Sequence, residues 1–277
     1  MSGEDTEQKD KGSIIERLAS GESFYLKGSP TISDFQDIIN LSERNKREYG
    51  IQINNLKDQS LETVYSVGKE KGIVAPEGFY DALKVFFHTH WRADEKRSEK
   101  SVMSMTPSYA QKRYSQFLIA DFGNTFMSLE AGGYQNIVSP LGITFLIGKE
   151  KHSKEAELTA NIRNKINVAN ETSAPIIFIK SGEHKGELID EFSEEVAMAN
   201  HLGENQHLLF TVRIPQLGSD YNMLFVKYEA LRELGVTSEE LCFKNGVNIL
   251  LEKLGVEVAH SKNLYRARAK YIKEAVI

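Results

Sequence analysis

Two histidines, one residue apart, end an apolar run in VFFHTHWRAD, residues 85–94. On an extended strand residues i and i+2 share a face, so His88 and His90 point the same way and could bind one cation, for which zinc is suited. Catalytic zinc sites usually take three protein ligands and leave the fourth position to water. The pair alone therefore predicts either part of a metal site or two surface histidines at the end of a strand.

The composition limits the class of protein. The chain has 277 residues, of which 40% are hydrophobic and 26% charged, enough for one large domain or two smaller ones. A formal charge of -5 gives no overall reason to expect nucleic acid. The segment KNLYRARAK, residues 262–270, is locally basic and could contact an acidic partner. The simpler interpretation of this segment is a solvated helix face. The single cysteine, Cys242, excludes an intramolecular disulfide and a multi-cysteine zinc site.

We expect a cytoplasmic, intracellular protein in a reducing compartment, with no contact to membranes. The opening MSGEDTEQKDKGS is polar and lacks the apolar core of a signal peptide. No apolar run approaches the roughly 20 residues that are needed to span a bilayer. Residues 1–30 are predicted to be a disordered tail.

The next part of the chain predicts a mixed set of elements. SDFQ, residues 33–36, has the Ser-x-x-Gln form of a capping box and predicts a helix over 34–47. Strands are expected over 48–56, 61–76 and 82–90, then an exposed loop over 91–105 and a helix that begins near Pro107. Residues 134–148 read as a hairpin that turns near Pro140 to Gly142.

The remainder predicts a second, smaller α/β unit. APIIFIKSG and HLLFTVRIP are expected strands, and YNMLFVKYEALREL and TSEELCFKNGVNILLEKLG are expected helices, the second with a Thr-x-x-Glu capping box at Thr237 and Glu240. The fold class is α/β (α+β), a mixed sheet with flanking helices, divided into residues 31–158 and 159–277. No phosphate-binding glycine loop is found, so nucleotide chemistry is not indicated.

Three motifs in one order resemble a known family. Glu48 leads the strand EYGIQI, with Gly50 where the family often has glycine; FFHTHW follows 40 residues later, and TPSYAQ then precedes a helix. A glutamate at a strand start, His-x-His at the end of a later strand and Ser-x-x-Asp at a helix start form the pattern of the JAMM (MPN-domain) metalloproteases. The chain resembles that family over about residues 33–148, which implies an MPN-like fold.

The resemblance implies a zinc site with assigned roles. His88 and His90 would be zinc ligands, Glu48 the general base and Ser108 the donor that stabilises the oxyanion. Zinc lowers the pKa of bound water towards about 7, and a nearby carboxylate can carry its proton to the leaving amine. A competing glutamate, Glu62, also leads a strand-like run but lies only 26 residues before His88.

The chain departs from the family pattern at two positions. Gln111 stands where the metal-binding aspartate is expected, and Trp91 stands where proline commonly follows the second histidine. An amide oxygen can coordinate a cation but removes one negative charge, so Gln111 as third ligand would weaken zinc binding. Asp94 and Asp121 are alternative carboxylates.

We therefore expect a zinc-dependent peptidase or isopeptidase that acts on a peptide or a ubiquitin-like conjugate, with residues 159–277 recognising substrate or partner. The alternative is a non-catalytic MPN-like scaffold subunit of a larger cellular or phage assembly, and a third reading is an unrelated α/β binding protein. The remaining histidines are expected to be surface or hydrogen-bonded core residues: His152, His184, His201, His207 and His260.

Overall fold

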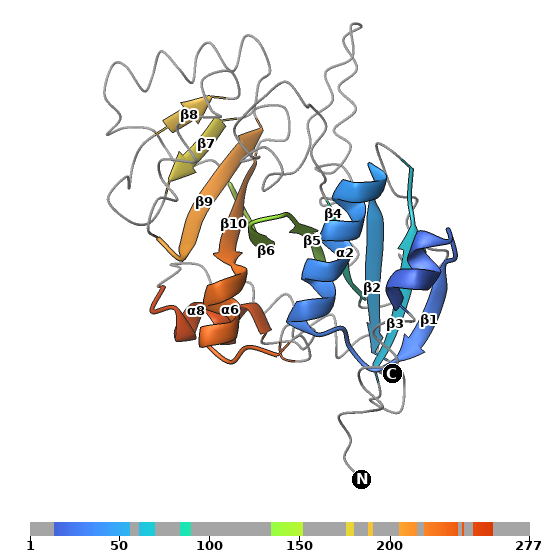
Figure 1. Ribbon diagram of the computed structural model, residues 1–277. Helices are drawn as coiled ribbons and strands as arrows, with labels where there is room; N and C mark the ends of the chain where they lie inside the picture. Colours follow the sequence, from blue (N-terminus) through green and yellow to red (C-terminus); the bar gives the residue numbers. More distant parts are fainter. Residues whose placement is uncertain are drawn as a thin grey trace, which may run out of the picture.

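The structure is a computed structural model, and it describes residues 14–55, 61–69, 84–89, 134–151, 176–179, 188–190, 205–214, 219–237, 240 and 246–256. Within these ranges ten strands form one sheet, in the order β1-β3-β2-β4-β5-β6-β10-β9-β7-β8 (Figure 1). The strands are β1 (Phe24–Lys27), β2 (Tyr49–Asn55), β3 (Leu61–Val67), β4 (Lys84–Thr89), β5 (Tyr134–Val138), β6 (Gly142–Lys151), β7 (Ile176–Ile179), β8 (Leu188–Asp190), β9 (His207–Ile214) and β10 (Ser219–Lys227).

The sheet is mixed, as the sequence predicts. Strands β4 and β5 pair in parallel, and all the other pairs of described neighbours are antiparallel. Strand β6 pairs with β10 along its length, so strands from both expected units, 31–158 and 159–277, belong to one sheet. The α/β class is confirmed, and the division of the chain near residue 158 stays a prediction.

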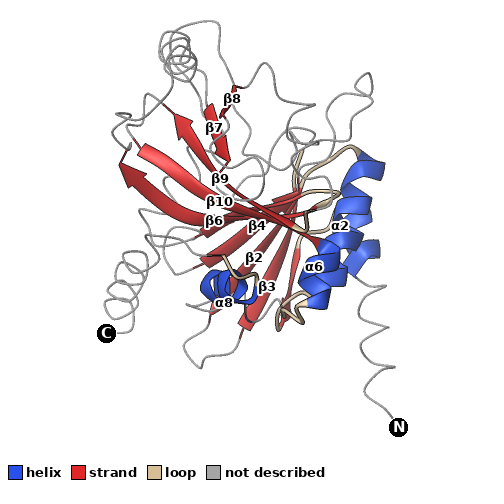
Figure 2. Ribbon diagram, turned by 90° about the vertical axis from the view of Figure 1, so that its left-hand side faces the viewer, coloured by secondary structure: helices blue, strands red, loops and turns tan. Residues whose placement is uncertain are grey.

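Helices cover one face of this sheet. Helix α2 (Ile32–Asn45) and helix α6 (Tyr228–Glu233) lie side by side against it, as Figure 2 shows, and helix α8 (Gly246–Lys253) adds apolar residues to the same core. We call this the helix face. Its core includes Phe35 of α2 and Phe87 of β4, whose ring centroids lie 4.7 Å apart. Among the described residues no helix is long and apolar enough to cross a membrane.

The other side of the sheet, which we call the opposite face, is also buried. Side chains alternate between faces along a strand, so His88 follows Phe87 onto the opposite face. Apolar side chains that are buried but lie outside the helix-face core follow the same alternation on β5, β6, β9 and β10: Ile137, Leu146, Leu208, Phe210, Val212, Met223 and Phe225. The central strands are therefore buried on both faces.

Helix α2 begins two residues earlier than its capping motif predicts. Thr31, not Ser33, is the N-cap, and the capping box joins Thr31 to Asp34, not Ser33 to Gln36. Thr31 and Ser33 could each be the N-cap, and Asp34 and Gln36 could each complete the capping box. The helix starts after Thr31, and both Ile32 and Phe35 are then buried. The second capping box is confirmed, because the Thr237 amide donates to Glu240 and the Glu240 amide donates to the Thr237 hydroxyl.

One expected helix is wrong over half of its length. Residues 221–227, predicted as the start of a helix over 221–234, belong to strand β10, and only residues 228–233 are helical. Strand β10 lies between β6 and β9, and Met223, Leu224, Phe225 and Val226 are all buried. A strand buried on both faces has a continuous apolar run with no period of two, so the run resembles a buried helix.

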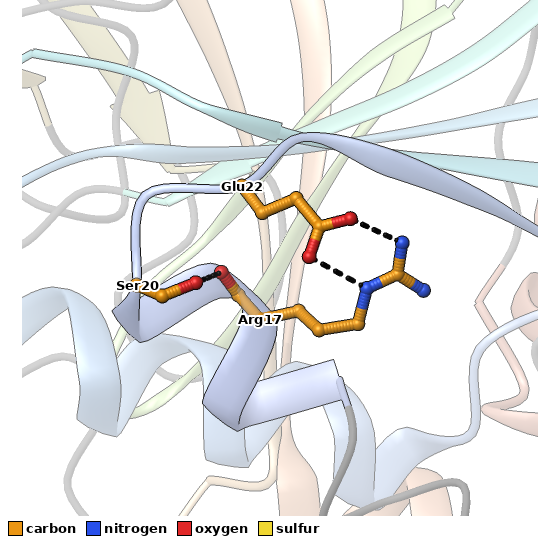
Figure 3. A network of polar contacts seen from close by, with 3 residues as sticks. All are labelled: Arg17, Ser20 and Glu22. Atoms are coloured by element: carbon orange, nitrogen blue, oxygen red, sulfur yellow. Dashed lines mark hydrogen bonds and ion pairs between the residues drawn. The ribbon is translucent and has the colours of Figure 1, made fainter.

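The beginning of the described chain is ordered. Residues 14–30, expected to belong to a disordered tail, instead contain a helical turn at 14–19 and the edge strand β1. The guanidinium of Arg17 binds the carboxylate of Glu22 through two nitrogens, and Ser20 donates to the Arg17 carbonyl (Figure 3). Arg17 also lies over the ring of Phe24 in β1. The hydrogen bonds from Arg17 hold the pKa of Glu22 below its usual value.

Candidate functional site

The pairing of β2 with β4 brings Glu48 near His88. Gly50 lies directly opposite His88 in this antiparallel ladder, and Glu48 is two residues before Gly50. Diagonal neighbours on adjacent strands have Cα atoms roughly 7–8 Å apart and point to the same face. The register therefore makes Glu48 a diagonal neighbour of His88, at the end of β4.

The backbone of Glu48 is part of the sheet although the residue precedes β2. Its amide donates to the Lys69 carbonyl at 3.0 Å, and its carbonyl accepts from the Gly68 amide at 2.9 Å. Both partners follow the end of β3. These two hydrogen bonds fix the backbone of Glu48. Because the residue is half-buried, its side chain keeps partial contact with solvent.

The competing glutamate lies too far away to serve the same site. Glu62 pairs with Asn54, four residues further along β2 than Gly50, which is roughly 13 Å along the strand at 3.3 Å per residue. It also lies one strand further from β4 than β2 does. The register of β2, β3 and β4 therefore favours Glu48 over Glu62 as the partner of His88.

His88 is a buried residue, with 3% of its surface exposed. It lies at the carboxyl end of β4, where β4 and β5 run in parallel, and it pairs with Ile137 of β5. A buried imidazole needs a partner for its ring nitrogens, and His88 interacts with a neighbouring group in this structure. The surface-histidine interpretation is wrong for His88, and both a ligand and a hydrogen-bonded core residue fit its burial.

Three expected site residues lie outside the described ranges: His90, Ser108 and Gln111. The alternative carboxylates Asp94 and Asp121 lie outside them as well, as does Trp91. Within the ranges that the structure describes, no three His, Cys, Asp or Glu side chains gather into a possible cation site. The described part of the candidate site is thus the pair Glu48 and His88.

Sequence reasoning missed a row of polar side chains beside this pair. Gln52 donates from Nε2 to Oδ1 of Asn54 at 2.7 Å, and Asn54 donates from Nδ2 to Oε1 of Glu62 at 3.3 Å. All three residues share the face of His88, and Oε1 of the buried Gln52 has no hydrogen-bond partner among the described residues. The alternation of the strand EYGIQINN predicts one polar face, but its burial could not be read from the sequence.

Of the other histidines, His207 lies within the described ranges. It is half-buried at the start of β9, and desolvation by burial lowers its pKa. It pairs with Val226 of β10, on the other side of the sheet centre from β4, so it is separate from the candidate site.

Comparisons with known proteins give no relative for this chain: no protein-family model, curated protein or solved structure matches it.

Proposed function

We propose that the chain is a zinc-dependent peptidase or isopeptidase with an MPN-like fold around residues 31–158. The observation that supports this most is the register of β2 and β4, which brings Glu48 beside His88 on one face of a mixed sheet. The order of motifs in the sequence implies that these two residues, which are 40 positions apart, lie close together, and the pairing of β2 with β4 supports this.

His88, which is the expected ligand within the described ranges, fits a zinc site in its chemistry. An imidazole is a preferred zinc ligand, and His88 sits in a buried setting where a polar ring must have partners. In the family-like arrangement His90, two residues later in the sequence, would be the second ligand, and Gln111 would contribute an amide oxygen. When bound, zinc would polarise a scissile carbonyl and acidify a water molecule.

The side chains of the protein then have distinct tasks. The Glu48 carboxylate takes a proton from the attacking water and gives it to the leaving amine, for which it must lie within hydrogen-bond reach of that water. Ser108 donates a hydrogen bond to the carbonyl oxygen as it gains charge. The substrate class is a peptide or the isopeptide bond of a ubiquitin-like conjugate, and the partner is a protein.

The substitution Glu48→Gln tests this proposal. It keeps the shape of the side chain and removes the proton acceptor, so hydrolysis of a peptide or ubiquitin-like conjugate should fall by about 10²–10⁴-fold while zinc content stays the same. Glu62→Gln is the matched control, because Glu62 lies on the same face but two strands from β4, and it should leave the rate unchanged. Equal rates for wild type and Glu48→Gln, or no zinc-dependent hydrolysis by wild type, contradict the proposal.

A second function is favoured by the replacement of the expected aspartate with Gln111. In that case the chain is a non-catalytic MPN-like scaffold subunit that binds a protein partner within a larger assembly. Wild-type protein that forms a stable complex, holds no zinc and cleaves nothing would support this alternative.

A further inference from the structure

A relay of buried hydroxyl groups joins helix α2, strand β4 and the start of β2. The Tyr49 amide donates to Thr89 Oγ1 at 2.8 Å, and Thr89 Oγ1 lies 2.8 Å from Ser42 Oγ. Ser42 Oγ in turn donates to the carbonyl of Arg47. Ser42, Tyr49 and Thr89 are fully buried on the helix face, so water does not replace these bonds.

The direction of the relay follows from the number of protons. A serine hydroxyl has one hydrogen, and that of Ser42 goes to the Arg47 carbonyl. The bond between the two hydroxyls must therefore be donated by Thr89 and accepted by Ser42. Thr89 then donates its single hydroxyl proton to Ser42 and accepts from the Tyr49 amide through one lone pair.

The two ends of the relay lie on either side of Glu48. One end is the amide of Tyr49, the residue after Glu48, and the other is the carbonyl of Arg47, the residue before it. The Arg47 amide also donates to the Ser42 carbonyl at 3.2 Å, next to Lys46, which adopts φ 50 and ends the helix. Together with the bonds of Glu48 to Gly68 and Lys69, this fixes every peptide group around Glu48.

Thr89 connects this segment with the histidine strand. It follows His88 directly in the chain, and its hydroxyl points to the helix face while His88 points to the opposite face. A shift of the end of β4 would therefore move Thr89 away from the Tyr49 amide. The same hydroxyl thus controls how β4 and Glu48 lie relative to each other.

We propose that Thr89 and Ser42 are positioning residues that hold Glu48 at a fixed distance from the imidazole of His88. The inference rests on the proposed function, because positioning matters when Glu48 acts as a base. A shift of about 1 Å in a catalytic group can cost roughly 10²-fold in rate. A relay that serves stability alone would affect unfolding but not the chemical step.

Thr89→Val, measured in the full-length protein, tests the proposal. Valine keeps the volume and leaves the Tyr49 amide without its acceptor, so kcat should fall by about 10–100-fold, with zinc content and KM unchanged. Thr89→Ser keeps the hydroxyl and should restore most of the rate. Ser42→Ala should lower kcat in the same direction.

Thr63→Val is the matched control. Thr63 is a buried threonine of β3 that donates to the Gly28 carbonyl at 2.6 Å, on the far side of β3 from β2 and β4. Its substitution should lower the melting temperature about as much as Thr89→Val and leave kcat unchanged. Equal kcat values for Thr89→Val and Thr63→Val at equal melting temperatures overturn the proposal.

Amide hydrogen exchange separates this inference from the proposed function. If wild-type protein neither binds zinc nor cleaves a substrate, the proposed function fails and the exchange rates decide the positioning. Thr89→Val should speed exchange of the Tyr49 and Glu48 amides at least about tenfold relative to Thr63→Val. Unchanged protection of both amides in Thr89→Val shows that the relay does not fix this segment.

Discussion

His88 lies directly opposite Gly50 in the ladder between β4 and β2. Glycine has no side chain, so the imidazole of His88 meets no directly opposed side chain on β2. Its diagonal neighbours are Gln52 of β2 and Glu48, which directly precedes β2. The diagonal neighbours of His88 on this side are thus a carboxylate and an amide, which suit a polar site better than an apolar core.

Zinc content is the first expected outcome. If His88 and His90 are ligands, purified wild-type protein holds about one zinc per chain, and the double substitution His88→Ala with His90→Ala removes it. His207→Ala is the control, because His207 is half-buried and separate from the site. Elemental analysis that finds no zinc in wild type, together with no rise in melting temperature on adding zinc, contradicts the prediction.

Substitutions of Gln111 test whether zinc binding can be strengthened. Gln111→Asp restores a negative charge to the expected third ligand, so zinc affinity should rise, by about tenfold or more. Gln111→Glu has the same charge with one more methylene, and comparing both by zinc titration separates the effect of charge from that of reach. If neither changes the affinity, TPSYAQ does not align with the Ser-x-x-Asp motif. If both reduce the affinity, either Gln111 is itself the third ligand, or it is no part of the site and Asp94 or Asp121 is the third ligand. Substitutions of Asp94 and Asp121 then distinguish these cases.

Gly142 should tolerate no side chain. A Cβ atom there would lie 2.1 Å from the Val226 carbonyl oxygen and 2.9 Å from the Lys227 Cα, both backbone atoms of β10. Gly142→Ala should therefore lower the free energy of unfolding by about 1–3 kcal/mol or more, measured by urea denaturation. Leu141→Ala, at the neighbouring position that is 38% exposed, should change it by less than about 1 kcal/mol. Similar losses for both variants would mean that β6 and β10 do not pack this closely.

His207 predicts a pH dependence of stability. Burial lowers its pKa from the usual 6.5, so below that value the unfolded chain binds more protons than the folded one. Stability should fall as the pH drops from about 7 through 6.5 to the lower folded-state pKa, and then level off. His207→Gln removes this contribution, so its melting temperature should decline less than that of wild type over the same window. Parallel curves for the two proteins would contradict the prediction.

Local patterns in the sequence were sufficient for much of the sheet. The alternation in EYGIQI predicted β2, and the turn residues near Pro140 predicted the hairpin of β5 and β6. Ser139 closes that turn through its amide and hydroxyl, which both donate to the Gly142 carbonyl. Such elements are determined by residues close together in the sequence, so local patterns predict them.

Elements that depend on distant partners could not be predicted in this way. The run NMLFV became a strand because β6 and β9 flank it, and no single sequence states which strands will be neighbours. The proximity of Glu48 to His88 was expected from a family pattern, not from spacing. The relay through Ser42 and Thr89 was missed. The sequence does not show whether two isolated hydroxyl residues, each in an apolar run, will form a hydrogen bond with each other.

The pairing of β6 with β10 has a consequence for the order in which the protein folds as it is synthesised. Strands β1 to β6 can assemble once residue 151 has left the ribosome, but β6 then has one unpaired edge, because its second neighbour begins at Ser219. An unpaired, apolar strand edge is a template for aggregation, and ribosomes add about 5–20 residues per second. The free edge of β6 is therefore exposed for several seconds before β10 pairs with it. A fragment that ends before residue 219 lacks β10 and should aggregate.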